Sequence, residues 1–174
     1  MTQSPTLPLQ WSDEFALNVP LIDSTHIEFV DLLGSVVKSE DSALLTHWLK
    51  LVAHTEEHFA REDRWMLATG FSPENCHSTQ HKIILQIMKE GAVRGESGAL
   101  DVIRQMADEL GMWFPQHAQN MDAGLAAHLT NLGFDPESGA QLSRGLLPST
   151  PIMGCHAPDC SGLRDAPGLA AIEA

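Results

Sequence analysis

The sequence contains no tyrosine, only three cysteines, and 10 basic against 23 acidic side chains, which leaves a formal net charge of −13. So few basic residues do not provide the positive face that binding to a nucleic-acid backbone requires. The same shortage of positive charge argues against an anionic membrane surface as a partner. We therefore expect neither nucleic acid nor a membrane among the partners, and the sequence identifies no protein partner.

Long apolar runs and secretion signals are also lacking. No uninterrupted apolar stretch reaches the roughly 20 residues that span a bilayer. The amino terminus, MTQSPTLPLQW, has neither the basic nor the apolar segment of a secretory signal. Three cysteines, an odd number in a chain of this length, do not suggest a disulfide framework. These absences together predict a reduced, cytoplasmic protein.

The chain is long enough and apolar enough to fold around its own core. It has 174 residues, of which 43% are apolar, so one globular domain is expected. Nine histidines stand out against the absence of tyrosine. Their positions within the apolar pattern carry most of the functional information.

Four stretches place apolar residues at the spacings of three and four that are typical of amphipathic helices. The stretches are 18–38, 43–69, 73–90 and 99–131. Asn18 at the start of the first stretch, and Ser42 and Ser72 just before the second and third, are suitable helix caps. The polar, glycine-containing segment 91–98 is predicted to be a loop. Pro115 interrupts the fourth stretch, so a kink or a junction of two helices is expected there.

The predicted fold is all-α, an antiparallel up-down four-helix bundle with short connections. An amino-terminal arm is expected at 1–17, the bundle at 18–132, and a Pro/Gly-rich, poorly ordered or loosely docked tail at 133–174.

His58 and Glu62 stand four positions apart within the second stretch, HTEEHFAREDRWM, and lie on or beside its apolar stripe. Residues four apart share one face of a helix, so both side chains are directed toward the interior. A buried imidazole and carboxylate need a compensating partner, and a metal ion is one. Polar residues in phase with the core occur in all four stretches: His26, His58, Glu62, His77, His81, His117 and Asp122.

Seven potential ligands exceed the needs of one metal ion. Two ions use them naturally, because a bridging carboxylate offers one oxygen to each ion. Imidazole-rich sets favour iron, zinc, copper or nickel over magnesium or calcium. His117 and Asp122 are five positions apart, which suits either a sideways reach of the aspartate or a helix distorted near Pro115.

The four motifs together resemble those of the hemerythrin family, in particular the single-domain bacteriohemerythrins. The resemblance covers residues 11–131 and rests on IDSTH ending at His26, HFARED from His58, HSTQH from His77, and HAQNMD from His117.

The resemblance implies a non-haem centre of two iron ions (Fe2+/Fe3+) with a bridging oxo or hydroxo group. It implies that Glu62 and Asp122 bridge the ions. It further implies that one ion is held by His77, His81 and His117 and the other by His26 and His58, which leaves a position for O2, bound as hydroperoxide. The implied function is an oxygen carrier, store or sensor module. A diiron enzyme (peroxidase, oxidase or nitric-oxide reduction) and a metal-binding bundle without redox chemistry are the alternatives.

Several residues depart from the family pattern or fall outside it. His54 stands where many relatives have tyrosine. It is expected to be a solvated or rim residue, or else to hydrogen-bond a bound ligand or relay protons. Asp63 is expected to face water, and His47 and His128 are expected at the surface. Apolar residues expected to keep water from the centre are Ile22, Phe29, Phe59, Trp65, Met66 and Trp113. In the tail, Cys155, His156 and Cys160 form either a soft-metal or redox site or part of an unstructured segment.

Overall fold

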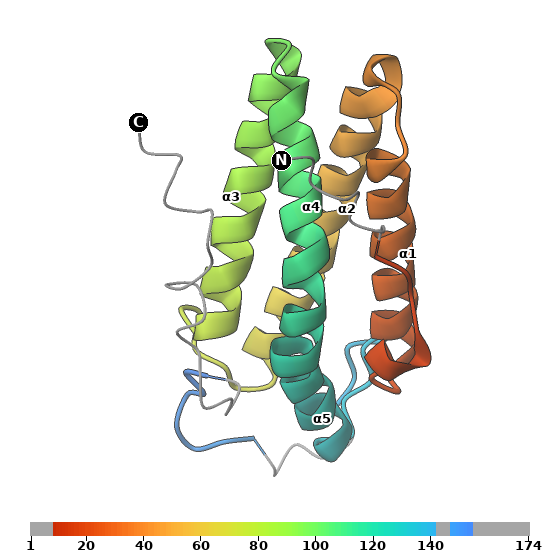
Figure 1. Ribbon diagram of the computed structural model, residues 1–174. Coiled ribbons are helices and arrows are strands. Elements are labelled where there is room, and N and C mark those ends of the chain that lie inside the picture. Colours follow the sequence, from red (N-terminus) through yellow and green to blue (C-terminus); the bar gives the residue numbers. More distant parts are fainter. Residues whose placement is uncertain (1–8, 142–146, 155–174) are drawn as a thin grey trace.

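The computed structural model describes residues 9–141 and 147–154. Its helical elements are η1 (Asp13–Phe15), α1 (Pro20–Val37), α2 (Asp41–Ala68), α3 (Cys76–Glu96), α4 (Leu100–His117), η2 (Ala118–Asp122) and α5 (Ala123–Asn131). Helices α1 to α4 stand side by side, each next to its neighbour in sequence, and α4 closes the bundle against α1 (Figure 1). The predicted all-α, up-down four-helix bundle is confirmed.

Two apolar clusters fill the bundle, and they are separated by a polar layer. The larger cluster contains Phe29, Phe59 and Phe114, and the smaller contains Ile22 and Leu125. Along α1, His26 lies between Ile22 and Phe29. Along α2, Glu62 lies between Phe59 and Trp65, and Asp122 lies between Ala118 of the larger cluster and Leu125 of the smaller. The seven candidate ligands therefore occupy a layer with apolar side chains above and below it, which limits the access of water.

The predicted helix starts were wrong in detail. Asn18 does not cap α1: it adopts a positive φ of 59°, and the cap position is Val19. The second helix begins at Asp41, before Ser42. The third begins at Cys76, where the Asn75 side chain accepts a hydrogen bond from the backbone N–H of Ser78 at 2.9 Å. Residues with capping side chains are frequent in these loops, so the pattern did not identify which of them caps.

The predicted loop at 91–98 was also wrong, because α3 continues to Glu96. Gly91 and Gly95 are buried within that helix. A Cβ on Gly91 would lie 3.2 Å from the Trp48 ring and would clash with Met106. These glycines therefore allow close helix packing and do not end the helix.

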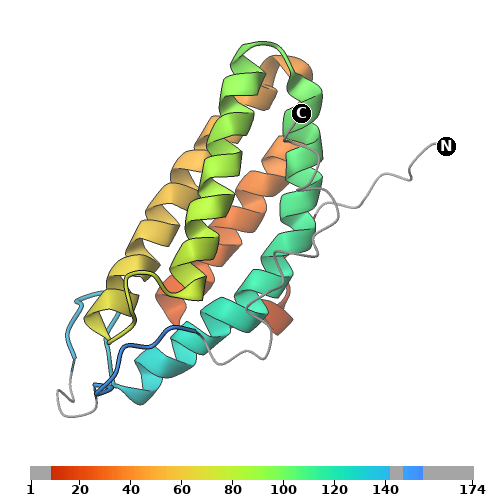
Figure 2. The same ribbon diagram turned by 90° about the vertical axis from the view of Figure 1, so that its left-hand side faces the viewer.

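The interruption expected near Pro115 is present: α4 ends at His117, two residues after the proline. Pro115 lies inside α4, and residues 118–122 form a π-helical turn before α5. Figure 2 shows the change of direction between α4 and α5. This turn carries Asp122 and follows directly on His117.

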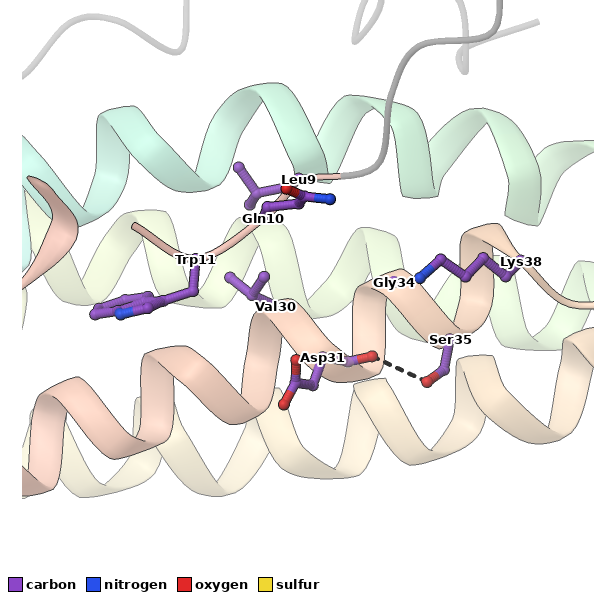
Figure 3. Close-up of a pocket in the computed structure, with 8 residues that line it drawn as sticks. All are labelled: Leu9, Gln10, Trp11, Val30, Asp31, Gly34, Ser35 and Lys38. Carbon is purple, nitrogen blue, oxygen red and sulfur yellow. Dashed lines mark hydrogen bonds between the residues drawn. The ribbon is translucent and has the colours of Figure 1, made fainter. Parts of the chain in front are cut away.

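The amino-terminal segment lies along the bundle, with Leu9 and Trp11 packed against the larger apolar cluster. Between this segment and α1 is a pocket, lined on that side by residues from Val30 in α1 to Lys38 directly after the helix (Figure 3). The pocket therefore lies along α1 beyond His26 and is separate from the seven candidate ligands.

Residues beyond α5 return to the bundle end that carries the turn between α2 and α3. Backbone N–H groups of Ser72 and Cys76 donate to the carbonyls of Ile152 and Met153, and the N–H of Ile152 donates to the carbonyl of Gly70.

The division into arm, bundle and tail stays a prediction. Within the described part of the chain, none of the helices combines the length and apolar character needed to cross a membrane.

Candidate metal centre

The structure brings all seven predicted site residues together. His26 comes from α1, His58 and Glu62 from α2, His77 and His81 from α3, His117 from α4 and Asp122 from η2. None of the seven is more than 4% exposed. Four helices and one π turn thus direct their polar side chains to one place in the core.

The seven residues form two overlapping groups of potential metal ligands. One group consists of Glu62, His77, His81, His117 and Asp122, and the other of His26, His58, Glu62 and Asp122. Within each group, the ligand atoms all lie within 4.8 Å of one another. Glu62 and Asp122 belong to both groups. We refer to them below as the five-donor group and the four-donor group.

Asp122 offers one oxygen to each group. Its Oδ1 lies 3.0 Å from His77 Nε2 and 3.1 Å from His117 Nε2, whereas Oδ2 lies 3.0 Å from His26 Nε2. A carboxylate that spans two sites in this way has the geometry of a bridging ligand.

Glu62 is arranged similarly. Its Oε1 lies 3.2 Å from His58 Nε2, and Oε2 lies 3.4 Å from His81 Nε2 and 3.5 Å from His77 Nε2. Each carboxylate thus directs one oxygen toward the α1–α2 side and the other toward α3.

Most of these close approaches are not hydrogen bonds. Both oxygens of Glu62 and of Asp122, and Nε2 of His26 and His58, are buried and lack an aligned partner. An unsatisfied buried polar atom costs about 1–3 kcal/mol, and charged groups cost more. Metal ions at these positions would satisfy the atoms, so the donor set fits such ions.

The hydrogen bonds of the outer nitrogens of two imidazoles also indicate that the donor set fits metal ions. His81 Nδ1 lies 3.0 Å from Asp63 Oδ1, and His117 Nδ1 lies 2.6 Å from Gln80 Oε1. Both partners are oxygen acceptors, so each Nδ1 carries the proton and each Nε2 is left with a lone pair. Those two Nε2 atoms lie 3.3 Å apart. Two facing lone pairs repel unless a cation lies between them.

The roles of Asp63 and Gln80 as hydrogen-bond partners of the histidines were not predicted from the sequence. Asp63 was expected to face water, but it is only partly exposed and bonds across to α3. Gln80 adjoins His81 in sequence but bonds to His117 on the next helix, and no local pattern reveals such a pairing. Such outer partners fix the orientation of ligand imidazoles.

The electrostatic setting keeps the carboxylates ionised. Burial raises the pKa of Asp122, but interactions with His117, His26 and His77 outweigh burial and hold the pKa well below its ordinary value. Burial and the Asp122 charge raise the pKa of Glu62, but the interactions with His58 and His77 outweigh both. The pKa of Glu62 is therefore also held well below its ordinary value.

The imidazoles respond in opposite directions. Burial lowers the pKa of His117 to about 4, despite the attraction of Asp122. Burial also lowers the pKa of His26, but Asp122 more than compensates, so the pKa of His26 is raised.

Aromatic rings cover the five-donor group. Phe59 stacks on His81 with 3.9 Å between ring centroids, and Trp113 stacks on His117 at 4.4 Å. Phe114, which was not among the expected wall residues, meets His26 edge-on at 5.1 Å, and Phe29 stacks on Phe114. The remaining expected wall residues, Ile22, Trp65 and Met66, lie in the smaller apolar cluster.

His54 lies between α1 and α2 at the edge of the centre. Its Nε2 is 3.1 Å from the Thr25 carbonyl oxygen, and its ring centroid is 6.3 Å from that of His58. Burial, followed by repulsion from His58, lowers the pKa of His54. The ring of His54 therefore reaches the surroundings of His58, while its side chain is 14% exposed.

The other histidines named in the sequence analysis, His47 and His128, lie away from the centre. His47 and His128, expected at the surface, are each partly buried and bonded, His47 to Ser39 and His128 to the Thr69 carbonyl. Cys155, His156 and Cys160 lie outside the described residues, so the prediction of a site there is untested.

Comparison with known proteins agrees with the geometry. A family model described as the hemerythrin HHE cation binding domain matches residues 17–129, a range that contains all seven candidate ligands. The bacteriohemerythrin of Ralstonia nicotianae is 33% identical over 132 residues, which cover 76% of this chain and 96% of that protein.

Two further bacteriohemerythrins are more distant. Those of Pseudomonas paraeruginosa and Stenotrophomonas maltophilia are 27% and 25% identical over 146 residues, with 79% of this chain and 95% of each relative covered. No solved structure matches the chain. The family model and the relatives agree with the convergent histidine and carboxylate cluster, and the chain therefore belongs to the hemerythrin family of non-haem iron proteins.

Proposed function

We propose that this protein holds two iron ions at the seven-residue centre and binds O2 there reversibly, as an oxygen carrier, store or sensor module of the cytoplasm. The observation that carries the proposal is the pair of overlapping donor groups, in which Glu62 and Asp122 each direct one oxygen to either side.

The residues divide naturally between two ions. His77, His81 and His117 would hold one ion, and His26 and His58 the other, with both carboxylates shared. The five-donor group supplies three imidazoles and the four-donor group only two. A bridging oxo or hydroxo group would complete the shared ligands, and O2 would bind on the side of His26 and His58, which supply fewer imidazoles.

When bound, a pair of ferrous ions would supply the two electrons needed to take O2 reversibly to the peroxide level. The chain favours stopping there, because five neutral imidazoles donate less negative charge than the carboxylate-rich sets of diiron oxidases. The surrounding rings of Phe59, Trp113 and Phe114 exclude water and stray protons, which would otherwise release peroxide. Binding without turnover is the outcome that this environment favours.

The test is to load the metal-free protein with Fe2+ under anaerobic conditions, admit O2 and record the visible spectrum. We expect two iron ions per chain and an absorption band that disappears when O2 is removed and returns when it is readmitted. Glu62→Gln, which removes a shared charge, should abolish the band, whereas Glu56→Gln on the exposed face of the same helix should leave it intact.

Two outcomes contradict the proposal. A band that decays while an added reductant is consumed indicates a diiron enzyme acting as a peroxidase, oxidase or nitric-oxide reductase. Tight Zn2+ binding with no oxygen-dependent band in the iron-loaded protein indicates a metal-binding bundle without redox chemistry.

A further inference from the structure

Thr25 is held by two side chains of the neighbouring helix. His54 Nε2 lies 3.1 Å from the Thr25 carbonyl oxygen, and Arg61 Nη1 donates to Thr25 Oγ1 at 3.2 Å. Thr25 is 6% exposed and directly precedes His26. These are the side-chain hydrogen bonds that join α1 to α2 in the described residues, and both end on Thr25.

The chemistry of Thr25 allows both bonds at once. Its hydroxyl donates to the Leu21 carbonyl at 2.7 Å, which leaves a lone pair to accept from Arg61. Its carbonyl has a second lone pair beyond the one used in the helix, and that lone pair accepts from His54. Arg61 is also fixed from outside by Glu57, at 3.1 Å.

The positions of these residues relate them to the four-donor group. His54 and Arg61 are seven positions apart, about two helical turns, and His58 lies between them on α2. On the facing helix, Thr25 adjoins His26. The two bonds therefore surround the place where the two histidines of the four-donor group face each other.

Other contacts of α1 would hold His26 less firmly. Apart from Glu28, whose Oε2 lies 3.6 Å from His54 Nδ1, the helix packs through apolar residues such as Ile22 and Phe29, whose contacts are not directional. His26 is the ligand that α1 supplies to the centre, and its outer nitrogen, Nδ1, has no hydrogen-bond partner among the described residues. His81 and His117, in contrast, are oriented by Asp63 and Gln80.

We propose that His54 and Arg61 are positioning residues for the metal centre. By holding Thr25, they fix α1 against α2 so that His26 and His58 face the same ion, and they do for the four-donor group what Asp63 and Gln80 do for the five-donor group. This inference rests on the proposed two-ion site.

The test uses Co2+ as the probe and follows stepwise binding to the metal-free chain by calorimetry and by the visible spectrum of the bound ion. Wild-type protein is expected to bind two ions. In the double variant His54→Leu/Arg61→Met, the first ion should bind normally, and the affinity for the second should fall by about 10–100-fold, as is typical for loss of an outer partner.

Matched variants separate positioning from general destabilisation. Thr25→Val removes the acceptor for Arg61 and should weaken only the second ion, whereas Thr25→Ser keeps the hydroxyl and should restore it. His54→Gln keeps an N–H donor and should bind more like the wild type than His54→Leu does. Lys89→Met breaks an exposed ion pair between α3 and α2, with Glu56, and should change neither affinity.

The results distinguish this inference from the proposed function. Fewer than two Co2+ ions in the wild-type chain would overturn the two-ion site and the positioning role together. Two ions in the wild type and an unchanged second affinity in both the double variant and Thr25→Val would overturn the positioning role alone. Equal weakening of both ions would also count against it, since a merely structural role affects both groups.

Discussion

His117 Nε2 and Asp122 Oδ1 lie 3.1 Å apart, although the two residues are five positions apart in the sequence. On an ideal α-helix, five positions would direct the side chains about 140° apart. Residues 118–122 instead form a π-helical turn, which takes more residues per revolution and brings Asp122 round to the side of His117. One short segment thereby supplies an imidazole of the five-donor group and a shared carboxylate.

Replacing Asp122 with asparagine should abolish the stabilisation that metal ions confer. At a free metal concentration 100 times the dissociation constant, binding stabilises the native state by about 2.7 kcal/mol. For a chain of this size, that raises Tm by roughly 5–10 °C. We expect this rise for wild-type protein with Zn2+ or Fe2+, and none for Asp122→Asn, as measured by calorimetry.

The matched control is Asp108→Asn, which removes an exposed carboxylate from α4. It should show the full metal-dependent rise. An equal rise in Asp122→Asn would contradict the assignment of Asp122 as a shared ligand.

The outer partners of the five-donor group should tune its affinity. Asp63→Ala and Gln80→Leu each remove the acceptor that holds an imidazole through Nδ1. Loss of such a partner costs typically 10–100-fold in metal affinity. Competition with a chelator should show this weakening for the first Zn2+ ion bound by either variant.

Glu74→Ala, which changes an exposed carboxylate shortly before α3, serves as the comparison for Asp63→Ala. If both substitutions weaken the first ion equally, the effect is one of overall charge, and the role given to Asp63 is wrong.

The metal-free protein should lose stability as the pH falls from about 6.5 to 4. The pKa of His117 is near 4 in the folded chain and about 6.5 when unfolded, so the unfolded state binds the proton more readily within that window. Neutral His117 therefore contributes stability above pH 6.5, and up to about 3 kcal/mol of it is lost on acidification. Urea unfolding at a series of pH values measures the slope.

Glu62, Asp122 and His26 change the stability of the metal-free protein in other pH ranges. The lowered pKa values of Glu62 and Asp122 remove further stability below about pH 4.5. The raised pKa of His26 has the opposite sign: its contribution is complete below pH 6.5 and is lost as the pH rises through its folded pKa. A stability that stays constant between pH 6.5 and 4.5 would contradict the shift given for His117.

Gly91→Ala should destabilise the fold by up to about 2 kcal/mol. The added methyl group meets the Trp48 ring at 3.2 Å and clashes with Met106, and overpacking of this kind costs about 1–3 kcal/mol. The better helix propensity of alanine offsets about 1 kcal/mol of that cost. Gly34→Ala in α1 is the matched case, because nothing lies within 4 Å of its new Cβ, and it should stabilise by about 0.5–1 kcal/mol. Urea unfolding of both variants tests the pair, and equal effects would contradict the packing role of Gly91.

Periodicity was sufficient to predict the four helices and the meeting of seven polar residues, because a buried donor in phase with an apolar stripe has few other places to face. His58 and Glu62 illustrate this, since their spacing of four places both on one side of any α-helix. The role of the seven as metal ligands is a separate question, which the loading experiments address.

Contacts between helices could not be predicted in the same way. The bond from His81 to Asp63 and that from His117 to Gln80 depend on how neighbouring helices are rotated, and a single helix pattern does not contain that information. Gly91 was misread for a related reason: glycine in a sequence looks like a helix breaker, whereas here the neighbouring Trp48 leaves no room for a larger residue.

The pairing of Ile152 with Gly70 and Ser72 has a consequence for how the molecule opens. Those bonds connect positions some eighty residues apart in the sequence, so neither partner can fray without releasing the other. The amide protons of Ser72, Cys76 and Ile152 should then exchange with solvent at a common rate, as one cooperative unit. The residues just before His77 are thus tied to a segment about eighty positions later in the sequence, and the two should open together.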